Sequence, residues 1–355
     1  MTLESLNTRL VRILLVVCVC VPAATNAAEI NCTGESSLSS VISCVKSSIQ
    51  PKDTELYSTV NDEATHSQFY SLIQNITERK VCEVSLPSAL SAIFKTKNYI
   101  EDSTTYCIIY TYQDVNVDGY FDDGHGVYII NMEVSPAPLS VVVPHPLYDT
   151  NTPALGIEVF SSLKGHVFSI AGAHRHTNDV TSLCQSSYKA ADSVHNIDNF
   201  FFTFHRAIHD ILSTLPHVQF HSMGSSTCPG VDVFISSGFS GQPNTTSPAM
   251  TIINAAATSH PEWDVAYPEA TNANGCNLYG TGNTIGRMMN AVPTRDVCTV
   301  AADKSTALAS SIFVQVELKW DYRSAVDWIP IMTTAFPRPA EEGGCTSFPL
   351  ESGYR

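Results

Sequence analysis

Basic residues are scarce in this chain. Its 355 residues include 19 lysines and arginines against 34 aspartates and glutamates, which gives a formal net charge of −15. Lysine and arginine nowhere form a basic run of the kind that binds a phosphate backbone. We therefore expect no nucleic-acid partner. The negative net charge still allows a small carboxylate-bearing or peptide-like substrate, because one local arginine or metal ion can outweigh the repulsion of an anionic substrate by the whole protein.

The chain also lacks an apolar run long enough to span a bilayer beyond its N-terminus. The run Ile13–Ala24 follows Arg9 and Arg12 and precedes the small residues Thr25–Ala28. A basic start, a short apolar core and a small-residue cleavage site are typical of a signal peptide, here residues 1–28. An N-terminal membrane anchor is the alternative. We expect a secreted or lumenal protein with no membrane span in the mature chain.

No Cys-x-x-Cys pair occurs, which argues against a zinc-thiolate site. Beyond the signal peptide there are nine cysteines, so in an oxidising compartment most should pair and at least one should be free or intermolecular. They are Cys32, Cys44, Cys82, Cys107, Cys184, Cys228, Cys276, Cys298 and Cys345. Three glycosylation sequons, at Asn31, Asn75 and Asn244, agree with a secreted glycoprotein.

The order of apolar segments predicts an α/β fold with a largely parallel or mixed sheet and helices on both faces. Residues 29–98 are expected to form a helical N-terminal extension, 99–335 the α/β domain and 336–355 a C-terminal tail. Strands are expected in the segments 105–115, 126–134, 139–144, 166–173, 217–225 and 311–320, and helices in 153–163 and 196–215. In the second helix Asn196 is the expected N-cap, and His205 and His209 fall on its polar face, where we expect them to be solvated.

Polar residues follow several of these strands, at the sheet edge where α/β proteins bind ligands. His145 and Asp149 come after the strand 139–144, and His221 lies at the end of the strand 217–225. Two histidines and a carboxylate are a common zinc ligand set in hydrolases, and such an ion lowers the pKa of bound water to about 7. Glu317, within an apolar strand, is the candidate catalytic carboxylate. Glu158 on the following helix competes with Asp149 as the acidic ligand.

Two arginines and a histidine are candidate substrate-binding residues. Arg175 and His174 follow the strand 166–173, and Arg287 ends the segment Gly280–Arg287. An arginine guanidinium can bind a substrate carboxylate through two parallel hydrogen bonds. We therefore predict a substrate that carries a carboxylate near the scissile bond.

These motifs resemble those of the metallocarboxypeptidase-like zinc hydrolases, in particular the N-formylglutamate amidohydrolase and poly-γ-glutamate hydrolase branch. The resemblance covers residues 140–320, and it rests on Pro144-His145, on His221-Ser-Met and on Gln315-Val-Glu317. It implies that His145, Asp149 and His221 bind zinc and that Glu317 is catalytic. The activity it implies is hydrolysis of an amide bond in an N-acyl-amino acid or a γ-glutamyl or peptide-like substrate.

Two departures from the family pattern leave alternatives open. Phe220 stands where an acidic residue precedes the second histidine, and Pro146 follows the first histidine in place of a small residue. Both favour a non-catalytic secreted binding module that keeps the hydrolase fold. A metal-dependent ester or phosphate hydrolase would use the same ligands.

A separate motif predicts a calcium site. Asp114, Asn116, Asp118 and Asp122 follow the D-x-N-x-D-G spacing of an oxygen-rich calcium loop. The twelfth position is His125 in place of glutamate, which argues against a regular EF-hand. The alternative is a hairpin turn, because Asp-Gly favours tight turns.

Overall fold

The computed structural model describes residues 28–52, 54, 57–60, 62–273, 275–305, 307 and 311–339. The expected signal peptide, apart from Ala28, lies outside the described residues, as do Cys345 and the tail from residue 340 on. The other eight expected cysteines form four disulfides, Cys32–Cys44, Cys82–Cys107, Cys184–Cys298 and Cys228–Cys276. These disulfides fit an extracellular protein.

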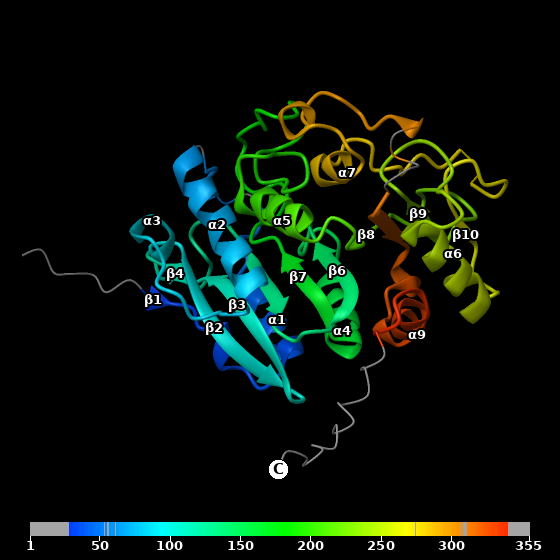
Figure 1. Cartoon of the computed structure of the whole chain (residues 1–355). Helices are drawn as coiled ribbons and strands as arrows, with labels where there is room; N and C mark the ends of the chain where they lie inside the picture. Colours follow the sequence, from blue (N-terminus) through cyan, green and yellow to red (C-terminus); the bar gives the residue numbers. More distant parts are fainter. Residues whose placement is uncertain are drawn as a thin grey trace, which may run out of the picture.

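In the part of the chain that the structure describes, a nine-stranded mixed sheet forms the centre, with strand order β10-β9-β11-β8-β6-β7-β5-β3-β2 (Figure 1). The pairs β10/β9, β11/β8, β8/β6 and β6/β7 are parallel, and the other neighbouring pairs are antiparallel. The prediction of a mixed α/β sheet is confirmed. The strands are β2 (Phe94–Glu101), β3 (Thr104–Thr111), β5 (Val127–Asn131), β6 (Ala137–Val143), β7 (Gly165–Ile170), β8 (His217–Ser222), β9 (Val233–Ser236), β10 (Val265–Ala266) and β11 (Phe313–Leu318).

Helices cover both faces of this sheet, so its central strands are apolar on both sides and read as continuous hydrophobic runs. One face packs against α1 (Leu38–Ser47), α4 (Thr152–Leu163), α6 (Pro248–Ser259) and α9 (Ala325–Ala335). The other packs against α2 (Glu63–Arg79), α5 (Phe200–Ile211) and α7 (Thr284–Met289). The prediction of helices on both faces is confirmed.

Helix α5 is shorter than its apolar stripe predicts. Its N-cap is Asn199, whose side chain accepts from the amide of Phe202, so the expected cap at Asn196 is wrong. Asn196 instead donates to the carbonyl of Ala190 in the preceding loop. His205 lies on the side of α5 that faces the sheet and is fully buried, not solvated as expected, because its ring contacts Ser169 on β7 and packs beside His217 on β8.

The N-terminal segments pack directly on the sheet. Strand β2 spans the boundary expected near residue 98, and the Cys82–Cys107 disulfide ties the segment before it to β3. Shorter elements complete the fold: β1 (Ala28–Glu29) pairs with β4 (Gln113–Asp114), and α3 (Ser88–Ser91) precedes β2. Within the described residues, no helix is long and apolar enough to cross a membrane.

Candidate metal centre

His145 and Asp149 lie on one turn of the chain that follows β6. The amide of Asp149 donates to the carbonyl of His145 at 2.8 Å, which brings the two side chains to the same side of the turn. His145 Nδ1 is 3.2 Å from Asp149 Oδ2. Both side chains are buried. Their four-residue spacing therefore has a structural reason, since one turn presents both groups to a common point.

His221 reaches the same carboxylate oxygen from the end of β8. Its Nδ1 is 3.1 Å from Asp149 Oδ2, and its ring centre is 5.1 Å from that of His145. The neighbouring Ser222 donates to Asp149 Oδ1 at 2.8 Å. Strand β8 lies next to β6 in parallel register, which is why residues more than seventy positions apart converge. The three side chains form a buried group with the geometry to hold a metal ion.

The far nitrogen of each histidine faces an acceptor. His145 Nε2 is 3.1 Å from Asp192 Oδ1, and His221 Nε2 is 3.2 Å from Gln219 Oε1. With its proton on Nε2, where an acceptor faces it, each histidine would have an Nδ1 lone pair for a metal ion; without an ion, Nδ1 faces a second acceptor, Asp149 Oδ2. In that tautomer two Nδ1 lone pairs and a carboxylate oxygen converge in a buried space, as a metal site requires.

The electrostatics of the group are strongly coupled. Burial opposes a charge on Asp149, but hydrogen bonds to His145 and His221 outweigh it and hold the pKa of that carboxyl far below its usual range. Burial and Arg175 lower the pKa of His145, yet Asp192 and Asp149 reverse the balance, so it is raised. For His221 burial prevails, and its pKa is lowered. Asp149 is therefore a carboxylate at neutral pH and His221 a neutral imidazole, the forms that bind metal.

Glu317 lies beside His221 on the adjacent strand, since the two residues are register partners in the parallel β11/β8 pair. The side chain is buried, and its Oε1 accepts a 2.8 Å hydrogen bond from Gln315. Burial, and then the charge of Asp149, raise the pKa of Glu317 to about 8. A carboxyl group whose pKa lies near neutrality can both take up and release a proton, as the proposed catalytic role requires.

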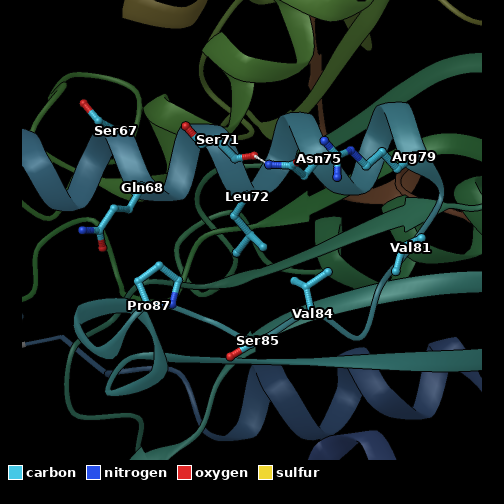
Figure 2. Close-up of a pocket in the computed structure, with 10 residues that line it drawn as sticks. All are labelled: Ser67, Gln68, Ser71, Leu72, Asn75, Arg79, Val81, Val84, Ser85 and Pro87. Atoms are coloured by element: carbon cyan, nitrogen blue, oxygen red, sulfur yellow. Dashed lines mark hydrogen bonds between the residues drawn. The ribbon is translucent and has the colours of Figure 1, made fainter.

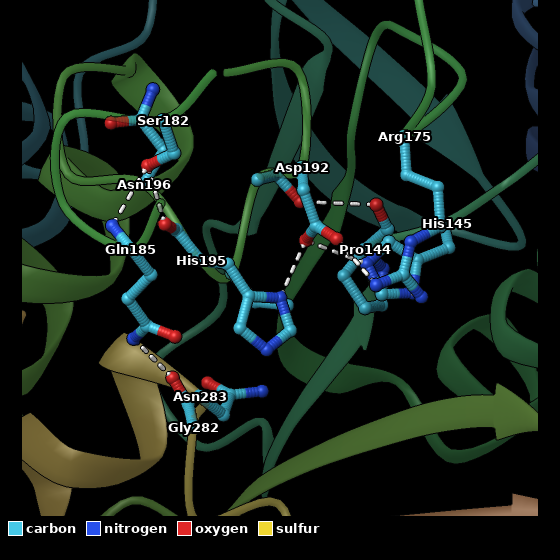
Figure 3. Close-up of polar contacts among 12 residues, drawn as sticks. Pro144, His145, Arg175, Ser182, Gln185, Asp192, His195, Asn196, Gly282 and Asn283 are labelled. Carbon is cyan, nitrogen blue, oxygen red and sulfur yellow. Dashed lines mark hydrogen bonds and ion pairs between the residues drawn. The ribbon is translucent and has the colours of Figure 1, made fainter. Parts of the chain in front are cut away.

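Sequence reasoning missed Asp192, which joins three of the polar side chains (Figure 3). Asp192 Oδ1 lies 2.8 Å from His195 Nδ1 as well as close to His145, and its Oδ2 forms an ion pair with Arg175 at 2.5 Å. Burial opposes its charge, but His145 and His195 hold the pKa of Asp192 well below its usual range. It also shares a second group suited to metal binding with His145 and His195. Asp192 lies in an irregular loop without a motif, so nothing in the sequence singled it out.

The predicted substrate-binding residues are separated in the structure. Arg175 reaches the site, with NH1 3.4 Å from His145 Nδ1 and its guanidinium over the ring of Tyr148. His174 lies at 5.8 Å from the Tyr148 ring, and burial lowers its pKa to about 4. Arg287 instead donates to the backbone carbonyls of Thr281 and Val297. Arg175 is therefore the better placed of the two arginines.

Glu158, the competing acidic ligand, and Phe220, the departure from the family pattern before His221, both face away from the site. Glu158 is exposed on α4, whereas Asp149 is buried between the two histidines. Phe220 points to the opposite face of the sheet, where it packs against Trp328 with ring centres 5.6 Å apart. The polar partner of His221 is therefore Gln219, and the replacement of an acidic residue by Phe220 does not remove it.

The predicted calcium loop is organised by its own carboxylates. Asp114 accepts from the amides of Asp118 and Gly119, and Asp122 accepts from the amide of Val115. Asn116 donates to Asp118 at 3.0 Å. These contacts describe a tight, oxygen-lined turn between β4 and β5. Calcium binding there stays a prediction.

A large cavity of about 580 Å³ lies elsewhere, between α2 and the segment 81–87 (Figure 2). Its lining includes Leu72, Val84 and Pro87, with Arg79 as its charged member. Asn75 of the second glycosylation sequon also lines it. A single charged side chain offers no converging set of acid, base and ligand groups, so this cavity is a poor candidate for hydrolytic chemistry.

No protein-family model and no curated protein matches the chain. Among solved structures it is similar to a "putative metallopeptidase" from Shewanella amazonensis SB2B, with a TM-score of 0.32 and 10% identity over 79% of this chain and 97% of that one. It is also similar to a "putative carboxypeptidase A" from Shewanella denitrificans OS-217, with a TM-score of 0.33 and 10% identity over 79% of this chain and 70% of that one. At these TM-scores the likeness assigns no function, so the chemistry of the site rests on its own geometry.

Proposed function

We propose that the protein is a secreted, metal-dependent hydrolase whose ion is held by His145, Asp149 and His221. One observation carries the proposal: both histidines present Nδ1 to Asp149 Oδ2 while their Nε2 atoms face the acceptors of Asp192 and Gln219. Nitrogen and oxygen donors from two histidines and a carboxylate suit Zn²⁺ and leave a coordination position open. When bound, the ion would supply a Lewis acid and an acidified water.

The chain's own residues would then move the proton and orient the substrate. Glu317, beside His221, would accept a proton from the attacking water and deliver it to the leaving amine. Arg175 would hold a substrate oxygen or carboxylate through the guanidinium edge that faces the site. Asp192, with its second oxygen on Arg175, would keep that guanidinium in place.

We propose an N-acyl-amino acid or a γ-glutamyl or peptide-like compound as substrate, with hydrolysis at an amide bond near its carboxylate. The residues that support this class are Arg175 and His174, which lie together with Tyr148 next to His145. An ester or phosphate substrate would meet the same ligands. An assay panel of amide, ester and phosphate compounds, each with and without a carboxylate, distinguishes these substrates.

One observation favours a non-catalytic alternative. His145 contacts both Asp149 and Asp192, and its pKa is raised, so a doubly protonated imidazole could bridge the two carboxylates without an ion. The site would then be a buried ion-pair network within a binding module. Hydrolysis of a panel compound that stops on chelation and returns with zinc supports the enzyme. No turnover of any compound by the zinc-loaded protein supports the binding module.

A further inference from the structure

A chain of contacts links the N-terminus of α7 to the carboxylate of the candidate metal centre. The amide of Gly286 donates to Asn283 Oδ1 at 3.0 Å, so Asn283 caps the helix. Asn283 Nδ2 donates to Gln219 Oε1 at 2.7 Å. That oxygen also lies 3.2 Å from His221 Nε2, and His221 Nδ1 lies 3.1 Å from Asp149 Oδ2.

Each contact fixes the direction of the next. Because the oxygen of Asn283 is taken up by the helix amide, its NH₂ group must face Gln219. Gln219 therefore presents its oxygen to His221 Nε2, as an acceptor that opposes the pull of Asp149 Oδ2 on a proton at Nδ1. Asn283, Gln219 and His221 are all buried, so bulk water is not available to take over these contacts. A proton on Nε2 leaves the lone pair of His221 on Nδ1, beside Asp149.

Gln219 needs this external support because an amide, unlike a carboxylate, can present either end. Asp192, the partner of His145, accepts in any orientation. Gln219 could instead turn its NH₂ group toward His221, which would draw the histidine proton to Nδ1. The amide nitrogen Nε2 of Gln219 has no hydrogen-bond partner in the part of the chain that the structure describes. The two contacts to its oxygen alone therefore hold its orientation.

We infer that Asn283 and Gln219 are positioning residues that hold His221 as the Nε2–H tautomer, so that Nδ1 is free to bind the metal. The inference rests on the proposed metal site. Neither residue contacts a reacting atom. Both act through His221. The N-cap hydrogen bond of α7 fixes the orientation of the Asn283 amide, and the Asn283 amide fixes that of Gln219.

Asn283→Asp tests this with a change of one functional group. Aspartate is as good an N-cap as asparagine, so α7 keeps its cap. Its second oxygen accepts where the asparagine donated, and Gln219 should rotate its NH₂ group toward it. The amide of Gln219 then faces His221 as a donor. The proton of His221 moves to Nδ1, against Asp149, and the metal-binding lone pair is lost.

The measurement uses the full mature chain, metal-free and labelled with ¹⁵N-histidine. Long-range ¹H–¹⁵N correlation spectra report which nitrogen of His221 carries the proton, and competition with a chromophoric chelator reports zinc affinity. We expect Nε2–H in the wild type, Nδ1–H in Asn283→Asp, and an affinity about 10- to 100-fold lower in the variant. Asn254→Asp, the same change at an exposed position of α6, is the control. It should keep the wild-type tautomer and affinity.

Nε2–H together with wild-type affinity in Asn283→Asp would overturn the inference. If that variant fails to fold, Gln219→Leu removes the acceptor at Nε2 and should shift the His221 proton toward Nδ1, where Asp149 remains as acceptor, with weaker zinc binding; unchanged spectra and affinity would overturn the inference equally. A reversed tautomer in a protein whose wild type binds no zinc supports the positioning role and contradicts the proposed function. The two claims therefore fail separately.

Discussion

Glu317 and His221 are register partners on adjacent parallel strands, and each is held by a glutamine two residues earlier on its own strand. Gln315 donates to Glu317, and Gln219 Oε1 lies 3.2 Å from His221 Nε2. The two glutamines are themselves register partners. The proposed proton carrier and one proposed ligand are thus set on a rigid sheet, which holds them more precisely than a loop would.

Glu317→Gln is expected to lower the hydrolytic rate about 10²- to 10⁴-fold, because it removes the group that transfers the proton. Burial raises the pKa of Glu317 to about 8, so the neutral glutamine resembles the protonated side chain of the metal-free protein at pH 7. The melting temperature of the metal-free protein should therefore stay close to that of the wild type. Turnover and calorimetry on the same preparation check this. Full activity in the variant would exclude Glu317 as the proton carrier.

Arg175→Lys is expected to weaken substrate binding by roughly 10- to 100-fold, mainly through KM, because lysine lacks the planar pair of donors that suits a carboxylate. Arg287→Lys serves as the comparison, since the Arg287 guanidinium donates to the backbone carbonyls of Thr281 and Val297 and should matter little for binding. Steady-state kinetics on one carboxylate-bearing substrate decide between them. A larger effect at Arg287 would reverse the assignment.

Acid should destabilise the protein through His125, which is fully buried against Phe94 and Phe200. Burial lowers its pKa from 6.5 to about 3. The unfolded chain therefore binds a proton below pH 6.5 that the folded chain refuses until about pH 3, and stability is lost as pH falls through this range. From pH 7 to pH 5 this one histidine should reduce the free energy of unfolding by about 2 kcal/mol.

The variant His125→Phe removes that contribution while keeping an aromatic ring. Its free energy of unfolding should fall by about 2 kcal/mol less than that of the wild type between pH 7 and pH 5, as measured by urea denaturation. If the free energy of unfolding fell by the same amount in the wild type and in His125→Phe, His125 would not be the source of the pH dependence.

Calcium is expected to raise the melting temperature if the loop Asp114–Asp122 binds it, since a ligand that binds only the folded state stabilises that state. The Asp114→Asn variant should lose the response, because Asp114 accepts two backbone amides at the centre of the turn. Scanning calorimetry with calcium and with a chelator gives the shift. Equal melting temperatures in both conditions would leave the loop as a hairpin turn.

The sequence predicted the parts of the fold that depend on local pattern. Strands β6, β7 and β8 follow from continuous apolar runs, and α4 follows from a proline at its start and a one-sided stripe. The position of β11 between β8, to which it is parallel, and β9, to which it is antiparallel, could not be predicted, because strand order depends on tertiary packing. The predicted N-cap of α5, Asn196, lies three residues before the observed one, Asn199, because both asparagines precede the apolar stripe and either can cap a helix.

The same division applies to the site. The sequence predicts His145, Asp149 and His221 from polar residues that follow or end apolar strands, and Glu317 from a carboxylate inside one; the structure brings them together. Their roles as ligands and base remain predictions. Asp192 and Asn283 were not identified, because both lie in irregular segments and gain their importance only from contacts across the fold.

The most direct test of the account is the zinc content of the purified mature protein, measured by mass spectrometry of the element. We expect one zinc per chain in the wild type, none in His145→Ala or His221→Ala, and one in the control His260→Ala, whose ring contacts Trp263 and Glu262 away from the site. Zinc-loaded wild type together with zinc-free ligand variants would support the metal centre. A wild-type protein that binds no zinc, or His145→Ala and His221→Ala variants that retain it, would contradict it.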